Sequence, residues 1–492
     1  MSQNRLNKSK LLNFLFRNKT TSQTIAKNTL WLSFGEVTGR FLRVIIIFFA
    51  ARILGVAAWG TFSYMTSLAA ILTIFADIGV STVLIREVSK DKTKKNELFS
   101  TTLLIKAILV LLGFIFIVFG SQLITGINLP TGLIWATALL FLFDSLRRFG
   151  SALFRAEEKM EYEAIINIFT QIVIVAAGFI VLFTQASPSR LALAYAGGSA
   201  IGLLVTGYIL RESISQIRTS FNKDLIKPLL SAAWPMTLST VFGMLLINID
   251  VIMIGWFESA ESVGLYTAAQ KPISFLYLLP ALIVGGLFPT LSKYAKSNKE
   301  KFRAVMEDGV GVILTLALPI VVGIVMLSSG LIDLVYGEEF LGSAGPLSVL
   351  SLSILITFPA TVIIHAIFAH HKEKKMVPIW LGGVLINIAL NLVLIPRLGI
   401  IGAAWASLIT QLFTNGTLWI LVNKISPFKI RDIYVVFRSA ILMGVAILVM
   451  KFMSISVVGI IILSPFVYLI LLILHKDKNL LGLISTIKGH VA

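Results

Sequence analysis

Long apolar segments follow one another along the whole chain, and they constrain its fold more than any other feature. Each spans about 20 residues, which is the length of an α-helix that crosses a bilayer. Because a spanning helix satisfies its own backbone hydrogen bonds, the pattern predicts an all-α polytopic membrane protein. We count fourteen such segments, near residues 28–53, 60–85, 98–119, 132–153, 163–185, 190–210, 231–256, 263–290, 309–332, 346–369, 377–395, 400–422, 433–451 and 455–475.

The composition agrees with a membrane protein. The 492 residues are 57% hydrophobic and 13% charged, whereas a soluble protein carries about twice that share of charge. The absence of cysteine excludes disulfides, thiol nucleophiles and cysteine-based metal sites. Basic cytoplasmic loops explain the net charge of +18, so we predict contacts with membrane lipids and no nucleic-acid partner.

The distribution of basic residues predicts the orientation in the membrane. With a cytoplasmic N-terminus, the connections on the cytoplasmic side and the two ends hold 31 Lys and Arg, whereas the outer connections hold Arg190, Arg397 and Lys451. This asymmetry predicts a multi-pass protein of the cell (cytoplasmic) membrane with both termini in the cytoplasm. Residues 1–23 are polar and basic rather than typical of a cleavable signal peptide, so we expect the first span to remain as an anchor.

The first apolar segment contains three charged residues, Glu36, Arg40 and Arg43. Their spacing of four and three residues places them on one face of a helix. An arginine at the centre of a bilayer costs roughly 3 kcal/mol on insertion scales. The helix should therefore turn this face toward protein or water, which predicts a cationic cavity. Glu36 could also pair with Arg40, which would leave Arg43 without a compensating charge.

Other basic residues lie within the predicted spans, among them Lys106, Arg147 and Lys271. Lys106 and Lys271 are too deep to reach the headgroups easily, so a water-filled cavity is the favoured interpretation. Arg147 and Arg148 lie toward the cytoplasmic end of their span, where lipid headgroups offer an alternative environment. Asp144 could pair with either arginine one turn away.

An internal repeat relates the two halves of the chain, with an offset of roughly 204 to 216 residues. Gly60-Thr61-Phe62-Ser63-Tyr64 matches Gly264-Leu265-Tyr266-Thr267, and Ala152-Leu153-Phe154 matches Ala366-Ile367-Phe368. Each repeat holds six spans, and an even number preserves orientation, so we predict parallel repeats. Transporters built in this way bind substrate between the halves. Pro272 and Pro280 also predict a kinked eighth span.

These observations predict two parallel six-helix lobes followed by two C-terminal helices. The expected boundaries are a cytoplasmic arm at 1–23, an N-lobe at 24–210, a cytoplasmic linker at 211–228, a C-lobe at 229–423, helices 13 and 14 at 424–475 and a cytoplasmic tail at 476–492.

Several short motifs occur in an ordered series between Arg52 and Tyr266. They are Arg52-Ile53-Leu54-Gly55, Gly60, Phe62, Asp77-Ile78-Gly79, Arg86, Leu153-Phe154-Arg155, Asn248-Ile249-Asp250, Ile254-Gly255 and Gly264-Leu265-Tyr266. Together they resemble the signature of the polysaccharide (O-antigen, Wzx-like) flippase family. That family belongs to the multidrug/oligosaccharidyl-lipid/polysaccharide exporter superfamily, and the resemblance includes fourteen helices in a 6+6+2 arrangement.

The resemblance implies translocation of a polyprenyl-pyrophosphate-linked oligosaccharide across the cytoplasmic membrane by alternating access. A cavity with several arginines and lysines suits a pyrophosphate, which accepts charge-assisted hydrogen bonds. Relatives that flip the peptidoglycan precursor carry cavity arginines in helix 1 and a basic residue in helix 8. By that resemblance Arg40, Arg43 and Lys271 are the leading candidates, and Glu36, Lys106 and Arg147 complete the predicted cavity.

The chain contains no Gly-rich phosphate loop followed by Lys-Ser or Lys-Thr. We therefore expect no ATPase and no cofactor, with transport coupled to H⁺, to Na⁺ or to the substrate gradient. Asp77 or Asp250 could carry a proton. Asn387 and Asn391 resemble the sodium-site region of some relatives, although interhelical hydrogen bonding is the simpler interpretation of these asparagines.

Other functions explain the pattern less well. A multidrug antiporter of the same superfamily would need acidic groups for cationic drugs, whereas this predicted interior is net basic. A membrane glycosyltransferase usually has a large loop with acidic residues, and every connection here is short. A scaffold in a polysaccharide assembly complex would not explain the embedded arginines. We therefore predict a transporter rather than an enzyme, with the lipid-linked glycan as substrate and a polysaccharide polymerase or other assembly proteins as further partners.

Overall fold

The computed structural model describes residues 20–217, 219–429 and 433–475. Most of the predicted N-terminal arm, one residue of the predicted linker (218), residues 430–432 and the whole C-terminal tail lie outside these ranges. The chain forms two compact units, residues 1–248 and 249–492, and the boundary falls inside one long helix. Within the described residues both units are helical, as the spacing of apolar segments predicts.

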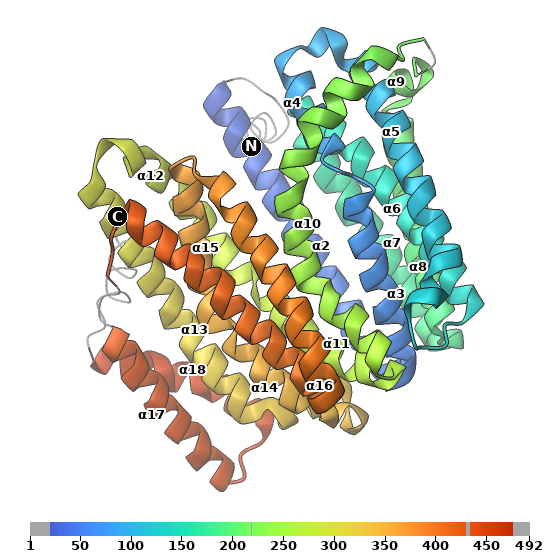
Figure 1. The fold of residues 1–492 in the computed structure, drawn as a ribbon. Coiled ribbons are helices and arrows are strands. Elements are labelled where there is room, and N and C mark those ends of the chain that lie inside the picture. Colours follow the sequence, from blue (N-terminus) through green and yellow to red (C-terminus); the bar gives the residue numbers. More distant parts are fainter. Residues whose placement is uncertain (1–19, 218, 430–432, 476–492) are drawn as a thin grey trace, which may run out of the picture. The chain divides into compact units, whose positions relative to one another are not determined.

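The first unit is built from helices of about 20 to 34 residues and two short ones (Figure 1). The closest packing joins α6 to α8, α2 to α7 and α7 to α8. These helices are α2 (Thr21–Leu54), α3 (Val56–Phe75), α4 (Val80–Lys90), α5 (Lys95–Ile115), α6 (Thr131–Ala156), α7 (Met160–Gln185), α8 (Pro188–Ile209), α9 (Arg211–Ser215) and the larger part of α10 (Ile226–Phe257).

The second predicted span, 60–85, is divided into α3 and α4. At the break Ile78 has φ 39° and Gly79 has φ 71°, a left-handed conformation that glycine adopts without the steric cost of a Cβ. Helix α3 ends at Phe75 and α4 begins at Val80. Asp77 therefore lies in the turn between them rather than in a regular helix.

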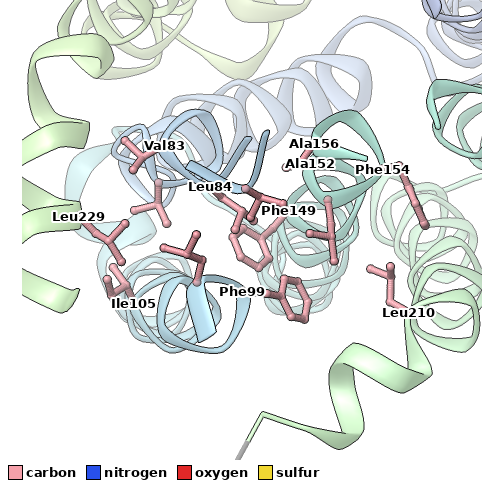
Figure 2. Close-up of a cluster of buried hydrophobic side chains, with 14 of the residues drawn as sticks. Val83, Leu84, Phe99, Ile105, Phe149, Ala152, Phe154, Ala156, Leu210 and Leu229 are labelled. Atoms are coloured by element: carbon pink, nitrogen blue, oxygen red, sulfur yellow. The ribbon is translucent and has the colours of Figure 1, made fainter. Parts of the chain in front are cut away.

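A hydrophobic cluster packs several helices of the first unit against one another (Figure 2). Leu84 from α4, Phe99 from α5, Phe149 and Ala152 from α6 and Leu229 from α10 all contribute to it. The rings of Phe99 and Phe149 stack with centroids 5.7 Å apart. Because the first turns of α10 belong to this cluster, the start of that helix is anchored in the first unit.

The second unit contains the remaining helices (Figure 1). In this unit α13 packs against α12, α14, α15 and α17, and α17 packs against α18. The helices are α11 (Ala260–Leu276), α12 (Leu278–Ser297), α13 (Lys299–Tyr336), α14 (Ala344–Leu352), α15 (Ile354–Ala369), α16 (Met376–Ile425), α17 (Ile433–Phe452) and α18 (Val457–Leu474).

Two features of this unit follow from glycine and proline. The predicted eighth span is broken between α11 and α12, and α11 ends at Leu276. In a continuous helix the Leu276 carbonyl would accept a hydrogen bond from the amide of residue 280, but Pro280 has no N–H to donate. The eleventh and twelfth predicted segments run together as α16, which turns sharply at Gly399 (φ 59°, ψ −140°). A φ of this sign is readily available only to glycine.

The two units contain the same loop after corresponding helices. After α6 the amide of Lys159 donates to the Phe154 carbonyl at 2.9 Å, and after α15 the amide of Lys372 donates to the Ile367 carbonyl at 3.1 Å. Glu158 and His371, one residue earlier, both have positive φ, 59° and 54°. The backbone therefore aligns Phe154 with Ile367, one residue away from the Phe154 and Phe368 match in the sequence.

Within the described residues, eleven helices or helix pairs are long and apolar enough to cross a membrane. The charged helices α2 and α6 are not among them, although each has more than 18 residues. The fold is that of an all-helical polytopic membrane protein, and the two long helices outside this apolar set, α2 and α6, both belong to the first unit.

Candidate functional site

A cavity of about 640 Å³ lies within the first unit, between α2, α3, α4, α5, α6, α7 and α10. Its lining combines apolar residues with four basic and three acidic side chains. The charged members are Glu36, Asp77, Lys106, Arg147, Arg148, Arg155 and Glu163. Four of these, Glu36, Asp77, Lys106 and Arg147, are residues that the sequence singles out.

Three charged residues of α6 form one ion cluster beside this cavity. Asp144 Oδ1 accepts from Arg147 Nη2 at 2.8 Å, and Asp144 Oδ2 accepts from Arg148 Nε at 2.6 Å. The predicted pairing of Asp144 with an arginine one turn away is confirmed, and it involves both arginines. The Arg147 side chain is 3% exposed and that of Arg148 is 54% exposed. Both line the cavity, but Arg147 is buried in its wall and Arg148 is exposed.

The buried position of Arg147 depends on a glycine in a neighbouring helix. A Cβ added to Gly202 of α8 would lie 2.7 Å from Arg147 Cδ and 2.2 Å from Thr170 Oγ1. Only a residue without a side chain lets α8 approach α6 and α7 this closely while the arginine stem passes between them. Sequence reasoning missed this role of Gly202, because one small residue among several in an apolar segment gives no distinct signal.

Lys106 and Asp77 form a salt bridge of 3.0 Å between Nζ and Oδ1. The lysine side chain is 2% exposed and the aspartate 28%. Ser81 Oγ donates to the same Asp77 oxygen from the first turn of α4. The sequence predicts Lys106 as a cavity cation and Asp77 as a separate proton carrier, and the structure joins them into one pair at the cavity wall.

Two further ion pairs lie at the cavity. The predicted pair of Glu36 and Arg40 is confirmed, with 2.6 Å between Oε1 and Nε and both side chains about half-exposed. Arg155 donates from Nε to Glu163 Oε2 at 2.7 Å, which joins the end of α6 to the start of α7. In the sequence Arg155 stands out only as part of the Leu153-Phe154-Arg155 motif, and nothing in the spacing indicates its partner across the turn.

Arg43 lies about one helical turn after Arg40 in α2. Its Nε donates to Gln171 Oε1 of α7 at 3.4 Å, and it interacts electrostatically with Asp144, Arg147 and Arg148 of α6. Its hydrogen-bond partner is thus a neutral amide, and Asp144 acts on it only at longer range, alongside the like charges of Arg147 and Arg148.

Lys271 lies in α11 of the second unit and is half-buried. It therefore belongs to a different compact unit from Arg43 and Lys106.

A second polar cluster lies inside the second unit around Asp250 of α10, which is fully buried. Asp250 Oδ1 accepts from Asn391 Nδ2 at 2.7 Å, and Oδ2 accepts from Tyr266 Oη at 2.7 Å and from Ser407 Oγ. Asn391 also donates to Asn387 Oδ1 at 3.1 Å. The structure thus brings together the predicted residues Asp250, Asn387 and Asn391, and adds Tyr266 and Ser407.

A comparison with protein families shows which family the chain belongs to. The family model described as "Polysaccharide biosynthesis protein" matches residues 25–295, which is more than half of the chain. The chain belongs to this family. The resemblance seen in the ordered motifs of the sequence is therefore confirmed, and it places the chain in the multidrug/oligosaccharidyl-lipid/polysaccharide exporter superfamily.

Two relatives come from Haloferax volcanii. The protein described as "Probable flippase AglR" is 28% identical over 405 residues, which cover 77% of this chain and 80% of the relative. The "Probable low-salt glycan biosynthesis flippase Agl15" is 25% identical over 387 residues, covering 78% and 80%. By this relationship the chain is a membrane flippase or transporter of polysaccharide biosynthesis and not an enzyme.

Solved structures show the same fold. The lipid II flippase MurJ in an inward closed conformation aligns with a TM-score of 0.74 and 18% identity, over 92% of this chain and 99% of that one. An inward-facing multidrug transporter of the MATE family aligns with a TM-score of 0.58 and 14% identity, over 80% and 94%. Fold similarity alone does not separate a lipid flippase from a drug transporter, so the chemistry of the cavity has to do so.

Proposed function

We propose that the protein translocates a polyprenyl-pyrophosphate-linked oligosaccharide from the inner to the outer leaflet of the cytoplasmic membrane. The sugar and the pyrophosphate are polar and costly in hydrocarbon, whereas the prenyl tail is stable among lipid chains. The protein has to shelter only the headgroup. Alternating access between the two repeats would carry it across, and the matching loops after α6 and α15 support an internal repeat of this kind.

The observation that carries the proposal is the cavity with Lys106, Arg147, Arg148 and Arg155 in its lining. Guanidinium groups present forked N–H donors that match phosphate oxygens, and their interaction strengthens away from bulk water. A volume of about 640 Å³ falls within the range of small-ligand sites, about 300 to 1,000 Å³. We infer from this size that it takes the pyrophosphate and the first sugar attached to it.

We also propose fourteen crossings with both ends in the cytoplasm. The eleven apolar helices or helix pairs among the described residues become fourteen when α2 and α6 are counted and α16 is divided at Gly399. Charges in α2 and α6 face the cavity or its ion pairs, which explains why two helices with such charges are stable in a bilayer. The strong bias of basic residues to one side supports the orientation.

The Asp250 cluster is proposed as the site of ion coupling, for H⁺ or Na⁺. Its oxygens come from the carboxylate of Asp250, the amides of Asn387 and Asn391 and the hydroxyls of Tyr266 and Ser407. Oxygen ligands of this type suit a hard cation. A half-turn of the Asn391 amide would replace its donor with an acceptor at Asp250, so the donor set fits a cation as well as a proton.

A multidrug antiporter remains the alternative of the same fold. A cationic drug would be favoured by acidic groups without basic partners. In this cavity the acids Asp77 and Glu163 are each bound to a base, and the bases of the lining outnumber the acids. The sign of the charge therefore favours an anionic substrate.

Complementation tests the proposal. A host lacking its own lipid-linked glycan flippase is transformed with the gene, and the lipid-linked sugars in its membrane are extracted and weighed by mass spectrometry. Restored surface glycan, with loss of the accumulated precursor, supports the proposal. Unchanged accumulation by a protein that is expressed in the membrane, together with resistance to cationic dyes, would favour the drug antiporter.

A further inference from the structure

The ion cluster on α6 has one acid for two bases. The Asp144 carboxylate uses both oxygens, one for Arg147 and one for Arg148. All three residues lie within two turns of one helix, so their spacing holds the carboxylate against both guanidinium groups. Asp144 is 22% exposed, and its two arginine partners line the cavity.

Asp144 also interacts with cations from other helices. Arg43 of α2 and Lys106 of α5 both interact electrostatically with Asp144 and with Arg148. Asp144 therefore pairs directly with Arg147 and Arg148, and it acts on Arg43 and Lys106 only through longer-range electrostatics. Lys106 has Asp77 as a direct partner, whereas Arg43 donates to the neutral Gln171. Asp144 is thus the principal negative charge for the three arginines.

A phosphate group needs the same donors that Asp144 occupies. Carboxylate and phosphate both bind guanidinium N–H groups through two oxygens, and the bonds are charge-assisted in each case. Among the described residues, the buried Nε of Arg147 has no hydrogen-bond partner. Arg147 therefore retains donor capacity beyond its bond to Asp144, while half-exposed Arg148 meets the cavity directly.

We propose that Asp144 is an internal counter-anion that competes with the pyrophosphate of the substrate for Arg147 and Arg148, and so speeds its release. Asp144 is a positioning residue in this scheme, since it acts through the arginines. As the substrate enters, its pyrophosphate replaces the Asp144 carboxylate in some of the hydrogen bonds from the two arginines. The carboxylate forms these bonds again as the substrate leaves. This inference rests on the proposed function, and it adds to that function an explanation of how a strongly cationic site avoids trapping its ligand.

The competition has a simple consequence for affinity and rate. Without the negative charge, the arginines attract an anion more strongly and offer it additional donors. We expect Asp144→Asn to bind a prenyl pyrophosphate about tenfold more tightly or better, and to translocate it more slowly because release becomes limiting. A residue that merely supports the fold would lower both the affinity and the rate.

The experiment uses the purified full-length protein. Binding of farnesyl pyrophosphate in detergent is measured by calorimetry, with farnesol as the comparison that lacks phosphate. Translocation of a nitrobenzoxadiazole-labelled prenyl pyrophosphate is measured in proteoliposomes by dithionite quenching. Asp308→Asn is the matched control, because it makes the same substitution at an exposed position of α13 in the other unit. Asp144→Glu is the rescue variant and should retain near wild-type behaviour.

The outcomes separate the two proposals. Wild-type protein that binds farnesyl pyrophosphate no better than farnesol would refute the proposed function itself. If the wild type binds it, tighter binding with slower translocation in Asp144→Asn supports the counter-anion. Equal or weaker binding, or tighter binding with undiminished translocation, overturns it. Should Asp144→Asn fail to fold, Asp144→Ser removes the same charge with a smaller side chain and is judged by the same criteria.

Discussion

Lys106 of α5 and Asp77, in the turn between α3 and α4, are joined by a salt bridge of 3.0 Å. The lysine is almost fully buried, and its carboxylate partner is held in turn by Ser81. The pair fixes the broken span to its neighbour at the wall of the cavity.

Removing the acid from this pair should destabilise the first unit. Asp77→Asn leaves the Lys106 ammonium buried beside a neutral amide. Breaking a buried pair costs about 3 to 5 kcal/mol, and the partial exposure of Asp77 reduces our expectation to about 2 kcal/mol. The melting temperature of the detergent-solubilised protein measures this loss. The double variant Asp77→Asn with Lys106→Met should recover much of it, and no recovery would argue against a simple charge pair.

Arg43 should be essential for export although it is not one of the residues that line the cavity. Arg43→Ala removes a cation that interacts with the Asp144 cluster and donates to Gln171. We expect export of the lipid-linked glycan to fall at least tenfold, equivalent to about 1.4 kcal/mol. Surface glycan in a flippase-deficient host provides the measurement. Arg190→Ala, in the exposed first turn of α8, is the matched control and should retain export, and normal export by Arg43→Ala would contradict the assignment.

The sequence predicts the parts of this molecule that depend on local spacing. Apolar length gives the helices, and i to i+4 spacing gives the Glu36–Arg40 and Asp144–Arg148 pairs, because these geometries are set within one helix. Local spacing does not predict pairs of residues that are far apart in the sequence and meet only through tertiary packing. Asn391 and Asp250 are 141 residues apart, and either could have satisfied its polar group with a different helix.

The break at Asp77-Ile78-Gly79 illustrates the same limit. The motif is visible in the sequence and contributes to the family resemblance, but its apolar surroundings favour a continuous span. The left-handed backbone at Ile78 is stabilised by packing of α4 against α5 and α6, a contribution that no local pattern encodes. Gly202 is a similar case, since its importance depends on the path of Arg147.

The exposure of Arg148 predicts a reactive position for a thiol. Because the chain has no cysteine, Arg148→Cys introduces a single thiol at the cavity wall, where the native side chain is 54% exposed. We expect rapid reaction with a charged methanethiosulfonate reagent. Val110→Cys on α5 is the control, because Val110 is 1% exposed. Protection of Cys at position 148 under all conditions would show that water does not reach this wall.

Asp250 should determine any cation dependence. If the cluster of Asp250, Asn387 and Asn391 binds Na⁺, then the wild-type protein melts at a higher temperature in NaCl than in choline chloride, because a ligand that binds the folded state stabilises it. Asp250→Asn should abolish the difference, whereas Asp333→Asn at an exposed site of α13 should preserve it. A wild type that responds equally to both salts would leave proton coupling as the form of the proposal to pursue.

The loop between α6 and α7 should make the first unit sensitive to acid. Burial raises the pKa of the Glu157 carboxyl, but hydrogen bonds from Lys159 and Lys95 outweigh burial and leave its pKa below the ordinary value. The unfolded chain therefore binds a proton at a higher pH than the folded protein does. The stabilisation is complete above the unfolded pKa of about 4.3 and is lost as the pH falls through the lower, folded value.

Glu157→Gln tests this linkage. The variant should melt at a lower temperature than the wild type at pH 7, where the wild-type carboxylate is ionised and bonded to Lys159 at 2.8 Å. The difference should shrink as the pH is lowered below about 4, because the wild type then loses the same charge. Melting temperatures from pH 3 to pH 7 provide the measurement. A constant difference across this range would mean that Glu157 acts through its shape and not through its charge.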